Sequence, residues 1–255
     1  MTTLAGKTAI ISGGGAGIGR ATASLFAARG ANVVVTDVDV ANGKATTDAI
    51  IAAGGAAVFV EHDVTDEEGW QHVVATATET FGGLDILFNN AGIYIIAPLA
   101  DITLETWNKL MAINVTGTFL GMKHAAPAIA VRGGGSIINA SSIAGLRGTA
   151  GHTLYGASKG AVRVMSKDVA AEYAAANVRV NSIHPTYVKT AMADYGAAIA
   201  GATVDELGAK MVPLGRLAEV DDVARVMAFL ASDDASFITG AEYVIDGGGT
   251  SCIML

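Results

Sequence analysis

The sequence predicts an α/β protein whose parallel sheet is covered by helices on both faces. Short apolar runs alternate with helix-like segments along the whole chain, and a glycine-rich turn joins the first run to the first helix. Parallel strands linked by right-handed helical crossovers produce this alternation. We expect seven strands, at residues 8–12, 32–36, 58–61, 86–88, 136–140, 178–183 and 243–245, and helices at residues 17–29, 66–81, 103–129, 154–176 and 220–231.

Composition favours a single domain over residues 1–255, because no linker-like, low-complexity or repeated segment divides the chain. A formal net charge of −8 without a basic cluster argues against nucleic acid or an anionic membrane as partner. The single cysteine, Cys252, excludes an internal disulfide and a multi-cysteine metal site, and no metal is expected. We recognise no signal peptide and no membrane span, so we expect a cytoplasmic location.

The glycine-rich turn is the first candidate binding site. Gly13, Gly17, Ile18 and Gly19 lie where the first strand passes into the first helix. Glycines there let the backbone approach a pyrophosphate closely, and the helix N-terminus adds N–H groups and a positive dipole end. A glycine cluster alone is more often an ordinary turn. Here strand, glycines, helix and second strand follow in order, which favours a dinucleotide site.

Asp37 ends the second strand and predicts NAD as the cofactor. A carboxylate there accepts both hydroxyls of an adenosine ribose and repels a 2′-phosphate. Ala16 and Val38 occupy the neighbouring positions, so we expect no cation to receive a phosphate. The alternative is that Asp37 is a turn residue or the N-cap of a following helix.

Tyr155 and Lys159 are the candidate catalytic pair. Residues four apart share one face of a helix, so both side chains can project into one cleft. A phenol titrates at about 10 and is a poor base at neutral pH. An ammonium about 4 Å away, at an effective dielectric of roughly 20, favours the phenolate by about 4 kcal/mol. We therefore expect Lys159 to lower the pKa of Tyr155 into a working range.

Together these motifs resemble the short-chain dehydrogenase/reductase family over essentially the whole chain. The matching residues are Ser12-Gly13-x-x-x-Gly17-x-Gly19, Asp63-Val64, Asn89-Asn90-Ala91-Gly92, Asn114, Ser142, Tyr155-x-x-x-Lys159 and residues 185–190. The resemblance implies a Rossmann-like doubly wound sheet with strand order 3-2-1-4-5-6-7. The chain departs from the family pattern at Ser12, where threonine is usual, and at Thr186, where glycine is usual.

The resemblance also implies residue roles. Ser142 would orient the substrate oxygen, and Asn114 would hold a water that links Lys159 to solvent. The implied cofactor neighbours beyond the glycine turn and Asp37 are Val38, Asp63, Val64, Asn90, Ala91, Gly92, Tyr155, Lys159, Pro185, Val188 and Thr190.

Several of these residues also have structural explanations. Asp63 could be the N-cap of the helix at 66–81, and Asn90 could be a turn former. Asn114 could be a buried amide satisfied by nearby backbone, an account compatible with the functional one. Ser142 could be a turn residue at a strand end, but its register thirteen residues before the tyrosine favours function.

The resemblance implies an NAD-dependent oxidoreductase that interconverts a secondary alcohol and its ketone, with Tyr155 as acid and base. The segment 187–212 would cover the substrate. Its many apolar side chains and mixed charges favour a hydrophobic, cyclic or aryl substrate. A 3-oxoacyl-acyl-carrier-protein-type reductase would be expected to prefer the phosphorylated cofactor and to carry basic residues near the mouth. A nucleotide-sugar epimerase would bring a longer C-terminal domain, and the intact motif argues against a non-catalytic NAD-binding regulator.

Two further expectations concern other surfaces. Apolar residues spread around more than one face of the helix at 103–129, which is more than a single core-facing stripe requires. The family is commonly tetrameric through this helix and the next, so we expect a homo-oligomer, and a tetramer most simply. Among the five histidines, none shows ligand spacing, and His152 could face the substrate because it lies just before Tyr155.

Overall fold

The structure is a computed structural model that describes residues 3–252, so the first two and last three residues of the expected domain lie outside the described part. Its sheet is parallel and seven-stranded with the order β3-β2-β1-β4-β5-β6-β7, which confirms the predicted fold class. The strands are β1 (Thr8–Ser12), β2 (Asn32–Asp37), β3 (Ala56–Glu61), β4 (Ile86–Asn89), β5 (Gly135–Ala140), β6 (Val178–Pro185) and β7 (Glu242–Ile245).

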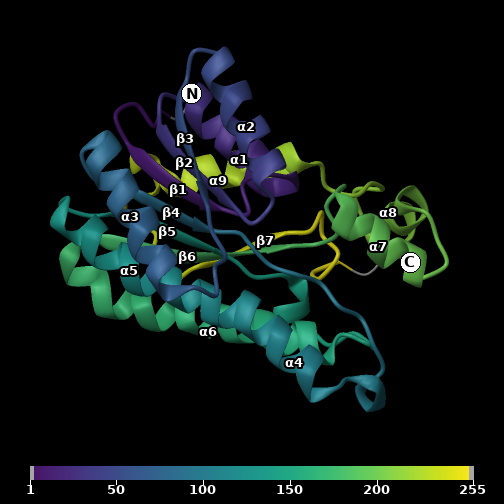
Figure 1. The fold of residues 1–255 in the computed structure, drawn as a ribbon. Helices are drawn as coiled ribbons and strands as arrows, with labels where there is room; N and C mark the ends of the chain where they lie inside the picture. The colour runs from purple at the N-terminus through teal and green to yellow at the C-terminus, as the bar shows by residue number, and fades with distance from the viewer. Residues whose placement is uncertain (1–2, 253–255) are drawn as a thin grey trace.

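Helices cover both faces of this sheet (Figure 1). The α-helices are α1 (Gly17–Ala28), α2 (Val40–Ala52), α3 (Glu67–Phe81), α4 (Leu104–Met111), α5 (Gly117–Val131), α6 (Thr153–Tyr173), α7 (Ala191–Ile199), α8 (Val204–Met211) and α9 (Val220–Ala231). Short helical turns are η1 (Leu99–Asp101), η2 (Ala112–Thr116), η3 (Ile143–Gly145), η4 (Ala174–Ala176) and η5 (Asp233–Ala235).

Neighbouring residues of the central strands enter different cores. Ile11 of β1 packs with α1 and α9 on one face, whereas Ile10 packs with α3 and α5 on the other. Both side chains are fully buried. A sheet covered on both faces therefore needs continuous apolar runs, which is why these strands could be recognised in the sequence.

The helix α2 was not predicted, because a glycine and three threonines or asparagines interrupt its apolar pattern. It begins after Asp39, whose carboxylate accepts a hydrogen bond of 3.0 Å from the Asn42 N–H. Gly43 lets the helix approach β3, since a Cβ at this position would lie 2.0 Å from the Phe59 ring. Tertiary packing and a cap thus outweigh the low helix propensity of the segment.

The helix expected at 103–129 is present, and it runs without a break from α4 through η2 into α5. The prediction missed the π-helical turn η2 in its middle, which carries Asn114. Such turns occur as single wide turns inside α-helices, frequently at functional sites. Periodicity alone does not distinguish one inserted wide turn from a regular α-helix.

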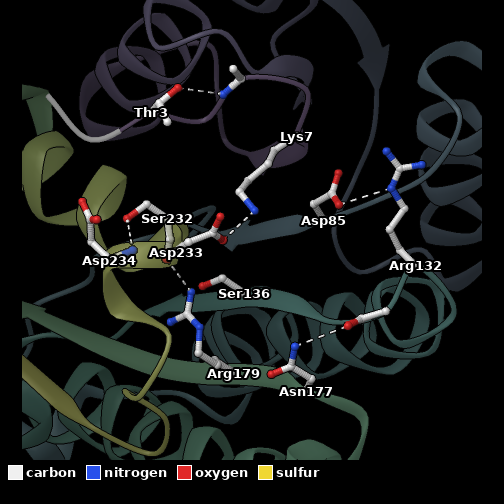
Figure 2. A network of polar contacts seen from close by, with 12 residues as sticks. Thr3, Lys7, Asp85, Arg132, Ser136, Asn177, Arg179, Ser232, Asp233 and Asp234 are labelled. Atoms are coloured by element: carbon white, nitrogen blue, oxygen red, sulfur yellow. Dashed lines mark hydrogen bonds and ion pairs between the residues drawn. The ribbon is translucent and has the colours of Figure 1, made fainter.

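A network of polar contacts joins the segments at the amino-terminal edge of the sheet (Figure 2). The Arg179 guanidinium, at the start of β6, donates 2.7 Å and 3.1 Å hydrogen bonds to the carbonyls of Leu230 and Ser232 at the end of α9. Asp85 accepts from the Thr8 N–H at 2.8 Å and pairs with Arg132 at 3.2 Å. This edge is held by structural contacts, which leaves the carboxyl-terminal edge for the site.

Candidate active site

The carboxyl-terminal edge of the sheet opens into a cleft with about 1030 Å³ of empty space, part of it continuous with solvent. The cleft adjoins the crevice between β1 and β4, where the strand order reverses and α/β proteins bind ligands. The sequence-predicted residues that line it are Ile18, Asn90, Gly92, Ser142, Tyr155, Lys159, Pro185, Val188 and Thr190. The other predicted residues are not part of this lining: Gly13, Gly17, Gly19, Asp37, Val38, Asp63, Val64, Ala91 and Asn114.

The glycine turn fits a bound pyrophosphate. Gly17 has a φ of +50°, and a Cβ at Gly19 would lie 2.1 Å from the Gly13 carbonyl oxygen, so the turn needs glycine at both positions. No side chain caps the N-terminus of α1 after Ala16. The N–H groups and the positive end of the helix dipole are thus available to an anion.

Asp37 is a turn residue, as one of the alternative interpretations held, but it is not a helix cap. Its carboxylate accepts 2.9 Å hydrogen bonds from the N–H groups of Gly15 and Asp39, which fix it at the end of β2. The cap of α2 is Asp39 instead, and Val38 is 64 % exposed beside it. A carboxylate has about four lone-pair sites, so two remain for other donors after these bonds.

Sequence reasoning missed a cation in this region. Arg20 of α1 donates to the Gly15 carbonyl and, at 3.0 Å, to the Asn42 side chain. Gly15 is the residue whose N–H contacts Asp37. The expectation that no cation receives a phosphate considered only the positions flanking the motif and not the first turn of the helix. It stays a prediction, because the Arg20 guanidinium is already bonded to Gly15, Asn42 and Thr46.

Asp63 and Val64 follow β3. Asp63 accepts 2.9 Å and 2.8 Å hydrogen bonds from the N–H and hydroxyl of Thr65, so it forms a turn. The N-cap of α3 is Asp66 rather than Asp63. The Val64 carbonyl accepts from the Trp70 indole at 2.9 Å, and Val64 is buried.

The Ser12 hydroxyl holds the loop after β4. It accepts hydrogen bonds from the N–H groups of Asn90 at 3.0 Å and Ala91 at 3.1 Å. The Asn90 amide donates to the carbonyls of Ser12 and Gly13 at 3.0 Å and 3.1 Å. Ser12 therefore does what a threonine hydroxyl would do at this position, and Asn90 joins β1, the glycine turn and β4.

Tyr155 and Lys159 lie one helical turn apart on α6 and are both buried. Burial raises the pKa of Tyr155 to about 12; the neighbouring Ser142 hydroxyl opposes this and the Tyr187 phenol adds to it. Burial lowers the pKa of Lys159 to about 8. The Lys159 ammonium lies 5.6 Å from the Tyr155 ring centroid and donates a 2.7 Å hydrogen bond to the Ala140 carbonyl.

These values correct the sequence argument, which expected the ammonium to lower the pKa of Tyr155. Desolvation of the phenolate raises the pKa of Tyr155 instead, and desolvation of the ammonium lowers the pKa of Lys159. At a pH above about 8 the lysine therefore loses much of the charge that would stabilise a phenolate.

Asn114 is fixed by the π-helical turn. Its amide accepts from the Ile93 N–H at 2.8 Å and donates to the Ile93 carbonyl at 2.9 Å and the Ser158 hydroxyl at 3.2 Å. A Cβ at Gly92 would lie 3.1 Å from the Asn114 oxygen and 3.6 Å from the Lys159 nitrogen. Both side chains therefore lie close to Gly92, and the Asn114 amide is satisfied mainly by backbone.

His184 contacts the backbone of Ser142 from behind the cleft lining, whereas the sequence indicated only a structural or exposed histidine. It is fully buried in β6, with Nδ1 3.1 Å from the Ser142 carbonyl and Nε2 2.9 Å from the Ser182 hydroxyl. A carbonyl only accepts, so Nδ1 donates and the Ser182 hydroxyl donates to Nε2. The signal in the sequence was weak: a histidine in a strand that runs beside the strand before Ser142.

Residues 185–190 carry the chain from β6 to α7. The Thr186 N–H donates to the Ile245 carbonyl at 3.1 Å. Among the described non-glycine residues only Asn177 has a positive φ, so Thr186 adopts ordinary backbone and this position does not need glycine. Thr190 reaches the glycine turn, because its methyl group would lie 3.1 Å from a Cβ at Gly17.

Apolar and aromatic side chains form much of the remaining cleft wall. They include Ile93, Ile143, Met192, Ala193 and Met211. His152 also lines the cleft, as the sequence suggested, whereas Ile199 is 50 % exposed and Tyr195 is 43 % exposed. No helix within residues 3–252 is long and apolar enough to cross a bilayer.

The doubly wound sheet, the glycine cradle and the buried tyrosine–lysine pair define an oxidoreductase that uses a nicotinamide cofactor. A family model described as "Enoyl-(Acyl carrier protein) reductase" matches residues 13–250. The chain belongs to the short-chain dehydrogenase/reductase family.

Three curated relatives cover nearly all of the chain. A 2,5-dichloro-2,5-cyclohexadiene-1,4-diol dehydrogenase from Sphingobium indicum is 44% identical over 96% of this chain and 96% of its own length. A cyclohexanol dehydrogenase from an Acinetobacter species is 41% identical over 96% and 95%. An NADP-dependent (R)-specific alcohol dehydrogenase from Lentilactobacillus kefiri is 42% identical over 97% and 98%.

Proposed function

We propose that the protein interconverts a hydrophobic cyclic secondary alcohol and its ketone, with NAD as cofactor. The observation that carries this proposal is the position of Ser142, Tyr155 and Lys159 in a largely apolar cleft beside the glycine cradle. The similarity to dehydrogenases of cyclohexanol and of a cyclohexadiene diol supports the same substrate class.

In the oxidation direction Tyr155 takes the hydroxyl proton of the alcohol, and in reduction it returns one to the ketone oxygen. Lys159 supports this by placing its nitrogen 5.6 Å from the centroid of the Tyr155 ring, and it would also bind the nicotinamide ribose. Ser142 orients the reacting oxygen, a positioning and electrostatic role. The nicotinamide supplies the hydride chemistry when bound, and the protein supplies geometry and proton transfer.

Asn114 would anchor a proton route from Lys159 to solvent. The support is its fixed amide in the π-helical turn and its approach, with Lys159, to Gly92. The segment 187–212 acts as a lid in this proposal, since Tyr187, Met192 and Met211 contribute to the cleft wall.

Asp37 supports NAD over NADP. A 2′-phosphate would meet the Asp37 carboxylate, and repulsion of about 2–3 kcal/mol corresponds to roughly 30- to 150-fold discrimination. Asp63, Val64, Asn90 and Ala91 would complete the contacts along the dinucleotide. The similarity to an NADP-dependent relative makes this a point for direct measurement.

The cleft does not favour an acyl-carrier-protein substrate. Its cationic side chains are Lys159, which is buried, and Arg147, which donates to the Gly249 carbonyl at 2.8 Å. A carrier protein brings an acidic surface that would call for several free cations at the mouth.

We also propose a cytoplasmic homo-oligomer, with a tetramer as the simplest form. Exposed apolar side chains on the outer helices support the oligomer: Leu104, Phe119, Val131 and Val164. The single cysteine suits a reducing compartment. Light scattering on the purified protein would give the mass directly.

A panel of cyclohexanol, an aryl secondary alcohol, a polyol and a sugar phosphate tests the substrate class, with NADH absorbance as the readout. We expect the highest kcat/KM for the cyclic and aryl alcohols. A preference for the polyol or the sugar phosphate would refute the proposal.

A further inference from the structure

Three side chains form a hydrogen-bonded cluster in the cleft wall, apart from the proposed proton-transfer groups. Tyr94 comes from the loop after β4, His152 lies directly before α6, and Tyr187 follows β6. The Tyr94 hydroxyl is 2.6 Å from His152 Nε2 and 3.1 Å from the Tyr187 hydroxyl. Segments far apart in the sequence thus bring three polar groups to one point of a largely apolar wall.

The direction of these hydrogen bonds follows from the last acceptor. His152 Nδ1 lies 3.0 Å from the Ala150 carbonyl, which can only accept, so in the neutral ring Nδ1 carries the proton. Nε2 is then an acceptor, and the Tyr94 hydroxyl donates to it. The Tyr94 oxygen accepts from Tyr187 in turn. Each N–H and O–H group of the cluster thus already donates a hydrogen bond, whereas lone pairs on the two phenol oxygens remain free to accept one.

Tyr94 is suited to hydrogen bonding rather than to proton abstraction. Burial raises the pKa of its phenol, and the neighbouring Tyr187 raises it further, so the group stays neutral at any working pH. A neutral phenol whose proton is already donated offers an acceptor. Such a group discriminates between a hydroxyl, which can donate, and an ether or ketone oxygen, which cannot.

The cluster also has a fixed relation to the proposed acid and base. The Tyr94 ring packs edge-on against the Tyr155 ring, with centroids 4.6 Å apart and planes at 67°. A substrate ring that presents one oxygen to Tyr155 therefore lies in the same cleft as the Tyr94 and Tyr187 oxygens. The remaining wall is largely apolar, so these oxygens are well placed to read a second polar group.

We propose that Tyr94, oriented by His152 and Tyr187, accepts a hydrogen bond from a second hydroxyl of the substrate. The preferred ligands are then cyclic diols, in which one hydroxyl is oxidised and the other donates to this cluster. This inference rests on the proposed function and narrows its substrate class. Because the cluster is already satisfied internally, we expect a gain of about tenfold rather than an absolute requirement.

The test compares each diol with its own monomethyl ether, which keeps ring and oxygen but cannot donate. Cyclohexane-1,3-diol and cyclohexane-1,4-diol are used, with kcat/KM expressed per reactive hydroxyl. In the native protein we expect kcat/KM for the better diol to be about tenfold higher than kcat/KM for its ether. Ratios of about one for both rings would overturn the inference.

Three variants locate the effect. Tyr94→Phe removes the acceptor and should bring the ratio to about one. His152→Phe removes the group to which Tyr94 donates, which frees the Tyr94 proton and should shift the preference toward the ether. Tyr195→Phe is the matched control, since its ring lies 6.0 Å from that of Tyr94 outside the hydrogen-bond chain, and it should keep the native ratio. A native ratio in Tyr94→Phe would contradict the assignment.

A binding measurement separates this inference from the proposed function. Calorimetric titration of the NAD-loaded Tyr155→Phe protein gives the Kd of diol and ether without turnover. We expect the diol to bind about tenfold more tightly than the ether, and this difference in Kd to be lost in the double variant Tyr155→Phe/Tyr94→Phe. That result supports the subsite even if the native protein oxidises neither compound. Equal Kd values for diol and ether would refute it even where both are oxidised.

Discussion

His184 Nδ1 donates a 3.1 Å hydrogen bond to the carbonyl of Ser142, across the boundary between β6 and the turn that follows β5. The Ser142 side chain accepts from the Ala144 N–H at 3.1 Å on its other side. The backbone and the hydroxyl of this serine are therefore held by two separate contacts. A serine that orients a reacting oxygen needs such support, because small displacements at the reacting atoms are costly.

We expect His184→Phe to reduce kcat about tenfold through misplacement of Ser142, with little change in NAD affinity. His184→Asn, which keeps a donor, should recover part of the loss. The checks are steady-state kinetics and NAD titration on the same samples, with thermal unfolding to detect general destabilisation. Burial lowers the pKa of His184, so the loss should be independent of pH near neutrality. A proportional loss of kcat and NAD affinity would indicate a general structural role instead.

Asp37→Ser should narrow the preference for NAD over NADP from roughly 30- to 150-fold toward equality, because the repulsion of a 2′-phosphate is removed. Arg20 remains beside Gly15 in this variant and can attract the phosphate. Adding Arg20→Ala should therefore reverse part of the gain with NADP. Kinetics with both cofactors measure each ratio. Equal specificity constants in the native protein would show that Asp37 does not select the cofactor.

Tyr155→Phe should lower turnover by about 10²–10⁴ while NAD still binds. The phenol oxygen is the proposed acid and base, whereas the pyrophosphate is held by the glycine turn. Activity and calorimetric NAD titration on one preparation test both halves. Substantial residual turnover would assign the proton transfer to another group.

Alcohol oxidation should rise with pH, because it needs Tyr155 as phenolate and burial raises the pKa of Tyr155 to about 12. Ketone reduction needs the protonated phenol and should fall over the same range. Lys159→Met should lower activity most at a pH below about 8, where the Lys159 ammonium is charged and favours the phenolate. Profiles of kcat/KM in both directions provide the measurement, and an equal loss above and below that pH would contradict this role of the charge.

The strands and the pairing of Tyr155 with Lys159 were predictable from local signals, whereas the sheet order and the role of Ser142 came from the resemblance to the family. Apolar runs mark strands buried on both faces, and a spacing of four residues on a helix fixes which side chains share a face. The glycine turn was equally predictable from the sequence. Gly19 packs so closely against the backbone of Gly13 that any side chain at this position would clash.

The remainder depended on contacts between distant segments. The wide turn at Asn114 follows from an amide that pairs with the backbone of Ile93, and its side chain carries no local sign of this. His184 and the Tyr94 cluster are likewise defined by partners 42 to 93 residues away. The direction of the Tyr155 pKa depends on burial, which a sequence does not give quantitatively.

The contacts of Arg179 at the amino-terminal edge of the sheet have a practical consequence for laboratory evolution. These contacts tie β6 to the end of α9 at the end of the strands remote from the cleft. A library of substitutions restricted to the loops after β4, β5 and β6 can therefore change the substrate preference, while the contacts that stabilise the opposite edge stay intact. Substitutions at the amino-terminal edge would lower the free energy of unfolding without altering which molecules the protein converts.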